Sequence, residues 1–143
     1  MSQGKSDHWG SYATVISIME SNMEPIYIIE SPSPEDMFDG RNEGEALSKA
    51  LKLSGCRTSY WLATNDEMLQ KAFQSIASDF GTNHPPGQMK SLYLHISAHG
   101  NEEGLSLTNG SFISWKKLSS RLKSLSEFIG VEQADGNIQV SRI

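Results

Sequence analysis

The sequence predicts an α/β domain in which helices cover both faces of a mostly parallel sheet. Three short apolar runs, residues 26–30, 57–62 and 92–97, have the length and the β-branched or aromatic content of buried strands. A helix-length segment separates each run from the next, and strands connected in this way lie parallel through right-handed crossovers. At 143 residues, the chain has the size of one domain with its own core. We therefore expect a three-layer sandwich of helix, sheet and helix.

Both connecting segments carry apolar residues at helical spacing. The first helix is expected from residue 41 to residue 53, ending before Gly55, where a C-terminal glycine belongs. The second is expected to run from a cap at Asn65 or Asp66 to about residue 80. The two apolar stripes consist of Ala46, Leu47, Ala50, Leu51 and Leu53, and of Met68, Leu69, Ala72, Phe73, Ile76, Ala77 and Phe80. Both stripes are predicted to face the sheet.

A hairpin and a helix follow the third strand. Asn109-Gly110 predicts a two-residue type I′ turn after a strand over residues 105–108, because both turn residues tolerate positive φ. Ser114 is a typical N-cap for a helix over residues 115–125. The third strand is therefore predicted to lead into a hairpin and then a capped helix.

The two ends of the chain lie outside this regular pattern. Residues 1–25 are interpreted as an N-terminal extension, although residues 12–19 have the composition of either a strand or a helix. Residues 138–143 have the composition of a further strand that has just begun. We therefore interpret residues 26–143 as a partial domain, incomplete at its C-terminus. A missing C-terminal segment or a partner chain is expected to complete the sheet, whose edge would otherwise be open.

Charge and composition narrow the classes of function. The formal net charge of −5 is unfavourable for binding nucleic acid or an anionic membrane surface. No apolar run approaches the roughly 20 residues that span a bilayer, and residues 1–10 lack the apolar centre of a secretory signal. The one cysteine, Cys56, cannot form an internal disulfide and is typical of a reducing compartment. The sequence thus predicts a cytoplasmic protein that binds neither nucleic acid nor membrane.

Polar side chains gather where the predicted strands end, which in an open parallel sheet is the edge that carries ligands and catalysis. His99 and Gly100 follow the third strand; an imidazole can act as a general base, and a glycine N–H can donate to an oxyanion. Ser31, Asp36 and Asp39 follow the first strand, and the two acids could orient a base. The alternative is that His99 is an ordinary loop histidine and that the acids are merely solvated.

Two other residues, His95 and Cys56, are of a type that could act together with His99, but both are expected to lie too far from it. His95 is four residues away, which on a strand is roughly 13 Å and too far to share a metal ion. Cys56 precedes the second strand at the amino edge of the sheet, roughly 20 Å from His99, whereas a nucleophile and its base need direct contact. The phosphate-binding patterns GxxxxGK[ST] and GxGxxG do not occur. We therefore expect no metal and no cofactor, and we interpret Trp61 and Trp115 as packing anchors.

The pattern around His99 resembles a known family. Residues 92–100, the Gly-Leu-Ser-Leu run at 104–107, the turn at 109–110 and the Ile-Ser-Trp-Lys-Lys-Leu run at 113–118 resemble the histidine half of caspase-like cysteine peptidases. The bacterial CHAT and caspase-family proteins are the most similar type. The match extends over about residues 26–125, in order and in spacing. It implies a caspase-like three-layer fold and a protein or peptide substrate.

The same resemblance implies roles for individual residues. His99 would be the catalytic base, and the N–H of Gly100 would contribute to the oxyanion hole. The loop that carries Ser31, Asp36 and Asp39 would lie near the substrate cleft. In the family the nucleophilic cysteine follows the next core strand, which places it beyond the end of this chain. The 143 residues alone are therefore predicted to be inactive. Two alternatives remain: a non-catalytic caspase-like binding or regulatory module, and a flavodoxin-like domain that binds a small anion.

Overall fold

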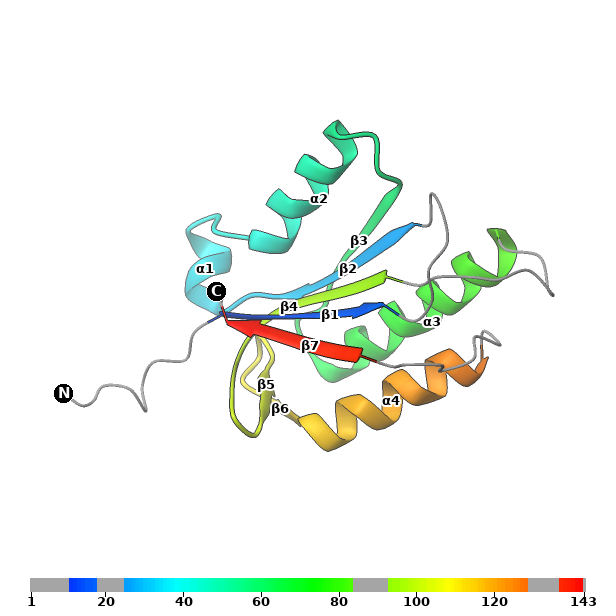
Figure 1. The fold of residues 1–143 in the computed structure, drawn as a ribbon. Helices are drawn as coiled ribbons and strands as arrows, with labels where there is room; N and C mark the ends of the chain where they lie inside the picture. Colours follow the sequence, from blue (N-terminus) through cyan, green and yellow to red (C-terminus); the bar gives the residue numbers. More distant parts are fainter. Residues whose placement is uncertain (1–10, 18–24, 84–92, 129–136, 143) are drawn as a thin grey trace.

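The computed structural model describes residues 11–17, 25–83, 93–128 and 137–142, which form an α/β fold around a mixed sheet (Figure 1). In chain order the elements are β1 (Ser11–Ser17), β2 (Ile26–Ser31), α1 (Pro34–Phe38), α2 (Glu43–Leu53), β3 (Thr58–Leu62), α3 (Asp66–Asn83), β4 (Tyr93–Asn101), β5 (Gly104–Ser106), β6 (Phe112–Ser114), α4 (Trp115–Phe128) and β7 (Asn137–Arg142). The predicted alternation of strands and helices between residues 26 and 128 is confirmed, and the short helix α1 is an addition to it.

The sheet has the strand order β3-β2-β4-β1-β7, and the β5–β6 hairpin pairs with the end of β4. The strands β3, β2 and β4 are parallel, because a helix crosses over between each strand and the next along the chain. In contrast, β1 is antiparallel to both of its neighbours, β4 and β7. The prediction of an α/β fold is confirmed, and the described strands form a mixed sheet, because β1 runs opposite to its neighbours.

The first strand also corrects the proposed N-terminal boundary. Residues 11–17 form β1, which pairs with β4 along its whole length, from Ser11 opposite His99 to Ser17 opposite Tyr93. The segment that was ambiguous between strand and helix is thus a strand inside the sheet and not part of an extension. Its Thr-Val-Ile run is typical of β structure, but a single strand gives no periodic signal of where it pairs.

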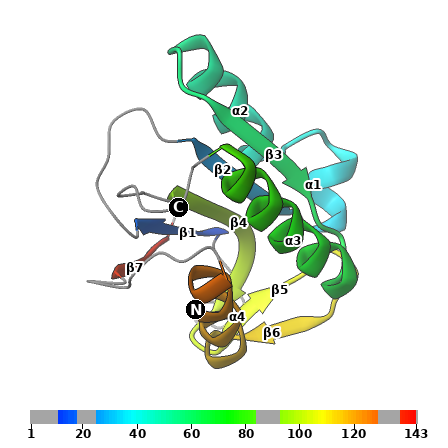
Figure 2. The ribbon, with the colours of Figure 1, turned by 90° about the vertical axis from the view of Figure 1, so that its right-hand side faces the viewer.

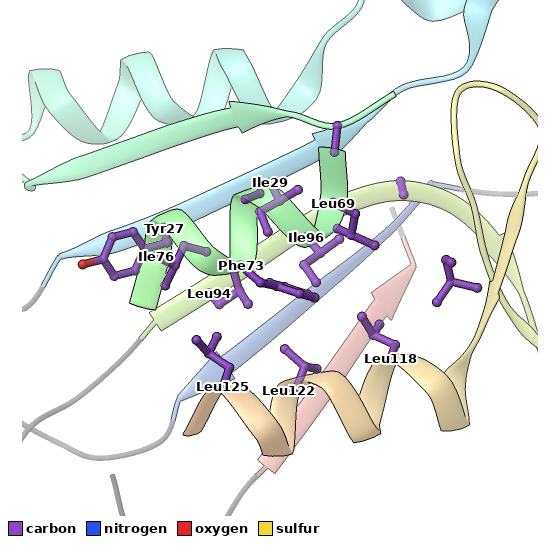
Figure 3. Packing of buried hydrophobic residues seen from close by; sticks show 14 of the residues in the cluster. Tyr27, Ile29, Leu69, Phe73, Ile76, Leu94, Ile96, Leu118, Leu122 and Leu125 are labelled. Atoms are coloured by element: carbon purple, nitrogen blue, oxygen red, sulfur yellow. The ribbon is translucent and has the colours of Figure 1, made fainter. Parts of the chain in front are cut away.

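Helices lie on both faces of the sheet, with α2 on one face and α3 and α4 on the other (Figure 2). Side chains alternate along each strand, so Tyr27 and Ile29 of β2 and Leu94 and Ile96 of β4 point toward α3 and α4 (Figure 3). This face holds the main hydrophobic core. The Tyr27 ring also stacks on Trp61, with centroids 5.9 Å apart.

The two crossover helices differ in how much of their apolar stripe is buried. In α3 the prediction is confirmed: six of the seven expected residues are buried, and Met68 is half-buried against the core. In α2 it is wrong, because the buried residues are Gly44 and Ser48, while Leu47 and Leu51 are half-buried and the rest of the stripe is exposed. Helical spacing locates an apolar face but not the depth to which the fold buries it.

The end of β4 and its hairpin extend beyond the predicted limits. β4 continues through His99 and Gly100 to Asn101, because β5 pairs with these residues after β2 has ended. The hairpin loop is also longer than a two-residue turn: the N–H of Leu107 donates to the carbonyl of Ser111 at 2.8 Å and encloses three residues. Within that loop, the φ of Gly110 is +88°, as in three-residue hairpins.

Side-chain caps and tryptophan contacts fix the ends of the later helices. The Oδ1 of Asn65 accepts from the N–H of Met68 at 2.8 Å, and the Oγ of Ser114 accepts from the N–H of Lys117 at 3.1 Å, which confirms both predicted caps. Trp61 and Trp115 are partly buried against the core, as predicted, and the Nε1 of Trp115 donates to the carbonyl of Asn101 at 3.1 Å.

In the described part of the chain, no helix is long and apolar enough to cross a membrane.

An ion pair joins the start of α3 to α4 and makes the stability depend on pH. The guanidinium of Arg121 donates to both carboxylate oxygens of Asp66, and Lys117 lies 3.9 Å from the same carboxylate. The hydrogen bonds from Arg121 lower the pKa of Asp66, and partial burial opposes this shift. A lowered pKa means that Asp66 stabilises the fold above its unfolded-state pKa of about 3.9, and that this contribution is lost as the pH falls through the folded-state value.

We therefore expect an Asp66→Asn variant to be less stable than the wild type at pH 7, with a difference that shrinks toward zero as the pH falls below about 4. Urea unfolding at a series of pH values measures this difference. A Glu67→Gln change at the neighbouring carboxylate, 80% exposed and bound to Lys71, is the control and should change stability little at any pH. Equal stability of wild type and Asp66→Asn at pH 7 would contradict the prediction.

Candidate functional site

His99 lies near the carboxyl end of β4, at the edge of the sheet where β2 also ends. Ser31, the last residue of β2, pairs with Ala98, so the chain that leaves β2 starts beside His99. The alternation along β4 places His99 with His95 and Ser97 on the face opposite the main core. The carboxyl ends of the parallel strands therefore bring the predicted candidate segments together.

The short helix α1 places Asp36 against His99. Ser33 caps this helix: its Oγ accepts from the N–H of Asp36 at 3.1 Å. Pro34 occupies the first turn, where the missing N–H has no intrahelical partner to lose. The segment that carries Ser31, Asp36 and Asp39 is expected to be a loop, but the Ser-Pro-Glu-Asp run within it is a helix-start signal that the prediction overlooked.

The imidazole of His99 contacts the carboxylate of Asp36 directly, with Nε2 lying 2.7 Å from Oδ2. The side chains are 27% and 22% exposed, so the pair is shielded from bulk water but still reachable from outside. An ionised carboxylate only accepts hydrogen bonds, so Nε2 donates to Asp36 in this contact. An imidazole oriented in this way can act as a general base, and Asp36 stabilises the imidazolium that results.

Arg41 holds Asp36 from the other side. Its Nε and Nη2 donate to Oδ1 of Asp36 at 3.1 and 3.0 Å, and its Nη1 lies 3.0 Å from Oδ2 of Asp39. Asp36 thus gives one oxygen to Arg41 and the other to His99. The hydrogen bond from His99 lowers the pKa of Asp36 most; burial opposes this, and the bond from Arg41 lowers the pKa further. Asp36 is therefore an anion at neutral pH.

The structure separates the three cleft candidates that follow β2. Asp36 contacts His99, whereas Asp39 is connected to the pair through Arg41. Ser31 is buried, 2% exposed, and its Oγ accepts from the N–H of Thr108 at 3.0 Å, so it fixes the hairpin to β2 rather than lining an open surface. Of the three, Asp36 is the one whose position supports a chemical role.

The backbone around Gly100 places this glycine inside the sheet. Gly100 is buried and pairs with Leu105 of β5, directly after His99 in β4. It therefore belongs to the strand itself and not to a loop after it, because the hairpin extends the pairing past the end of β2. The donation of its N–H to an oxyanion stays a prediction.

Neither His95 nor Cys56 joins the candidate site. His95 lies in the same strand as His99, and burial lowers its pKa, which favours a neutral ring. Cys56 is half-buried and lies two residues before β3, so the strand register places it roughly 25 Å from His99 along the strand direction. Among the described residues, no group of three or more His, Cys, Asp or Glu side chains could hold a metal ion.

The sequence-based prediction missed Arg41, although two signals were present. Opposite charges stand on either side of a turn at Gly40, whose φ is +74°, and such a turn brings positions 36 and 41 together.

A groove of about 480 Å³ lies apart from the site, between α3 and α4, and is lined in part by Phe73, Leu125 and Phe128. It shares no residue with the site and lies on the other face of the sheet.

Comparisons with known proteins give no relative for this chain. No protein-family model, no curated protein and no solved structure matches it significantly. The function must therefore be inferred from the site itself.

Proposed function

We propose that this chain is the histidine-bearing part of a caspase-like cysteine endopeptidase. The observation that supports this most is the 2.7 Å contact between His99 and Asp36 at the carboxyl edge of parallel strands. Parallel β2, β3 and β4 with helices on both faces are also what a caspase-like three-layer sandwich requires. The residue next to His99 is a glycine, as in the His-Gly pair of the family.

In the proposed reaction His99 is the general base. Its imidazole takes the proton of a cysteine thiol, and the thiolate attacks the scissile carbonyl of a peptide substrate. Asp36 orients the ring and stabilises the imidazolium, and Arg41 holds Asp36 in place. The N–H of Gly100 would donate to the oxyanion. His99 then returns its proton to the leaving amine.

The nucleophile is proposed to come from outside the 143 residues. The sequence contains one cysteine, Cys56, which lies at the opposite edge of the sheet. The end of β7 is at the same edge as His99, because Tyr12 of β1 pairs with both Arg142 and Ala98. A cysteine that follows β7, or one from a partner chain, would therefore lie on the correct side of the sheet.

The test is covalent labelling of the complete gene product, purified from its own cells, with a peptidyl acyloxymethyl ketone that alkylates nucleophilic cysteines. We expect one cysteine to be labelled, and we expect His99→Ala to slow labelling on the order of 10²-fold, because general-base assistance is lost. His95→Gln, a change in the same strand away from Asp36, is the control and should label at the wild-type rate. The 143-residue chain alone should stay unlabelled at Cys56.

Labelling that is absent, or that does not change in His99→Ala, would contradict the peptidase and favour a non-catalytic module with the same fold. The observation that favours this second function is the separation of Cys56 from His99. A flavodoxin-like anion site has less support. The Glu30 carboxylate already accepts from the N–H groups of Gly44 and Glu45, which are the donors that the start of α2 would offer to an anion.

A further inference from the structure

Glu30 is a buried carboxylate that the proposed reaction does not use. It is the next-to-last residue of β2, and it is 2% exposed. A buried carboxylate needs hydrogen bonds to offset the loss of water, and Glu30 has three. Its Oε2 accepts from the N–H of Gly44 at 2.8 Å, and its Oε1 accepts from the N–H of Glu45 at 3.0 Å and from the hydroxyl of Tyr60 at 2.7 Å.

These bonds make Glu30 the cap of α2. Asn42, at the N-cap position, makes no side-chain capping hydrogen bond, so the first amides of the helix are satisfied by a residue of the neighbouring strand. The negative charge also suits the positive end of the helix. Burial and the hydrogen bond to Glu30 raise the pKa of Tyr60, which keeps the phenol protonated and able to donate.

The residue at position 44 shows how closely α2 approaches Glu30. A Cβ added to Gly44 would lie 3.0 Å from the Cβ, Cδ and Oε1 of Glu30, which is tighter than ordinary van der Waals contact. Glycine therefore allows the helix to reach the carboxylate, and a larger residue would force one of the two to move. The pair behaves as one junction between strand and helix.

The chain between the two partners of this junction carries Asp36. It leaves β2 after Ser31, forms α1, turns at Gly40 and returns to α2. Within this segment, the N–H of Arg41 donates to the carbonyl of Asp36 at 2.8 Å, so the segment is braced internally. Ser31 fixes its start to the hairpin, and Glu30 fixes its end to the sheet.

We infer that Glu30 is a positioning residue for the His99–Asp36 pair, acting through the start of α2. His99 is fixed in β4, whereas Asp36 is on a segment whose return to the sheet depends on the bonds from Gly44 and Glu45 to Glu30. This role deepens the proposed function, since the pair it positions is the proposed base site. It does not require that the peptidase reaction occurs.

The test is the titration of the Asp36 carboxyl group in the full 143-residue chain, followed by ¹³C NMR. The contact with His99 lowers the pKa of Asp36. The His99→Ala variant removes this contact, so it should raise the pKa of Asp36 toward an ordinary value and gives the largest shift to be expected. In Glu30→Gln, an amide nitrogen replaces one acceptor oxygen, so at least one of the amides of Gly44 and Glu45 should lose protection from hydrogen exchange. We expect the Asp36 midpoint to rise by at least half of the His99→Ala shift.

Tyr60→Phe is the matched control, because it removes the third bond of Glu30 and keeps both amide bonds. It should lower stability without moving the Asp36 midpoint. An unchanged Asp36 midpoint in folded Glu30→Gln would overturn the inference and leave Glu30 as a stabilising cap alone. If Glu30→Gln does not fold, Gly44→Ala decides: a rise in the midpoint supports the positioning role, and an unchanged midpoint overturns it.

The two proposals fail separately. A moved Asp36 midpoint without cysteine labelling of the complete protein would support the positioning role and exclude the peptidase. Labelling with an unmoved midpoint would support the peptidase and exclude the role of Glu30.

Discussion

A Gly104→Ala variant is expected to lose about 3 kcal/mol of its free energy of unfolding, at the upper end of the range for overpacked sites. Gly104 is buried at the start of β5 and pairs with Ser114 of β6. A Cβ at this position would lie 2.0 Å from the carbonyl oxygen of Ile113 and 2.8 Å from the Cα of Ser114. These are backbone atoms of the paired strand, so they cannot move aside without breaking the hairpin.

Thermal unfolding followed by circular dichroism measures this loss, and the midpoint should fall by about 10 °C. Gly81→Ala is the matched control: Gly81 is in α3, and an added Cβ has nothing within 4 Å. The control should stabilise the protein by roughly 0.5–1 kcal/mol, because alanine is a better helix former. Equal midpoints for the two variants would show that the β5–β6 pairing is looser than described.

A Phe80→Ala variant is expected to lose about 4 kcal/mol, because deleting a large buried ring removes its transfer free energy and leaves a cavity. Phe80 is 0% exposed and belongs to the last buried turn of α3, in the core that joins this helix to β2 and β4. The loss should appear as a lower urea midpoint with an unchanged slope, since the surface exposed on unfolding stays nearly the same.

Phe38→Ala makes the same chemical change where the ring is 91% exposed, and it should change the urea midpoint little. A loss of the same size in both variants would contradict the location of the core between the sheet and α3. A small loss in Phe80→Ala would mean that the surrounding side chains collapse into the cavity. Comparison of the two variants therefore separates the effect of burial on stability from the effect of residue type.

The site shows which of its features a sequence can predict. Parallel strands end at one edge of the sheet, so the segments that follow β2 and β4 must lie near each other. That rule predicted that His99 and the acids after the first strand are neighbours, and the contact of Asp36 with His99 agrees with it. The rule works at the level of strand ends. It does not decide which side chain of a loop makes the contact.

The choice among Ser31, Asp36 and Asp39 depended on the path of the segment between β2 and α2. The Ser33 cap starts α1, and Arg41 then binds both acids, which directs one oxygen of Asp36 to His99. Buried Glu30 was not predicted, because a single acid at a strand end gives no periodic signal. Its role depends on where α2 begins in space.

The sequence by itself determined the α/β class, the order of the elements from residue 26 to residue 128 apart from α1, and the edge of the sheet at which His99 lies. These features follow from local periodicity, capping residues and the direction of the chain, all of which can be recognised within short segments of the sequence. Tertiary structure alone decided that β1 pairs with β4, that α2 buries little of its apolar stripe and that Asp36 is the partner of His99. Each of these depends on contacts between segments far apart in the sequence, whose energies no local pattern contains.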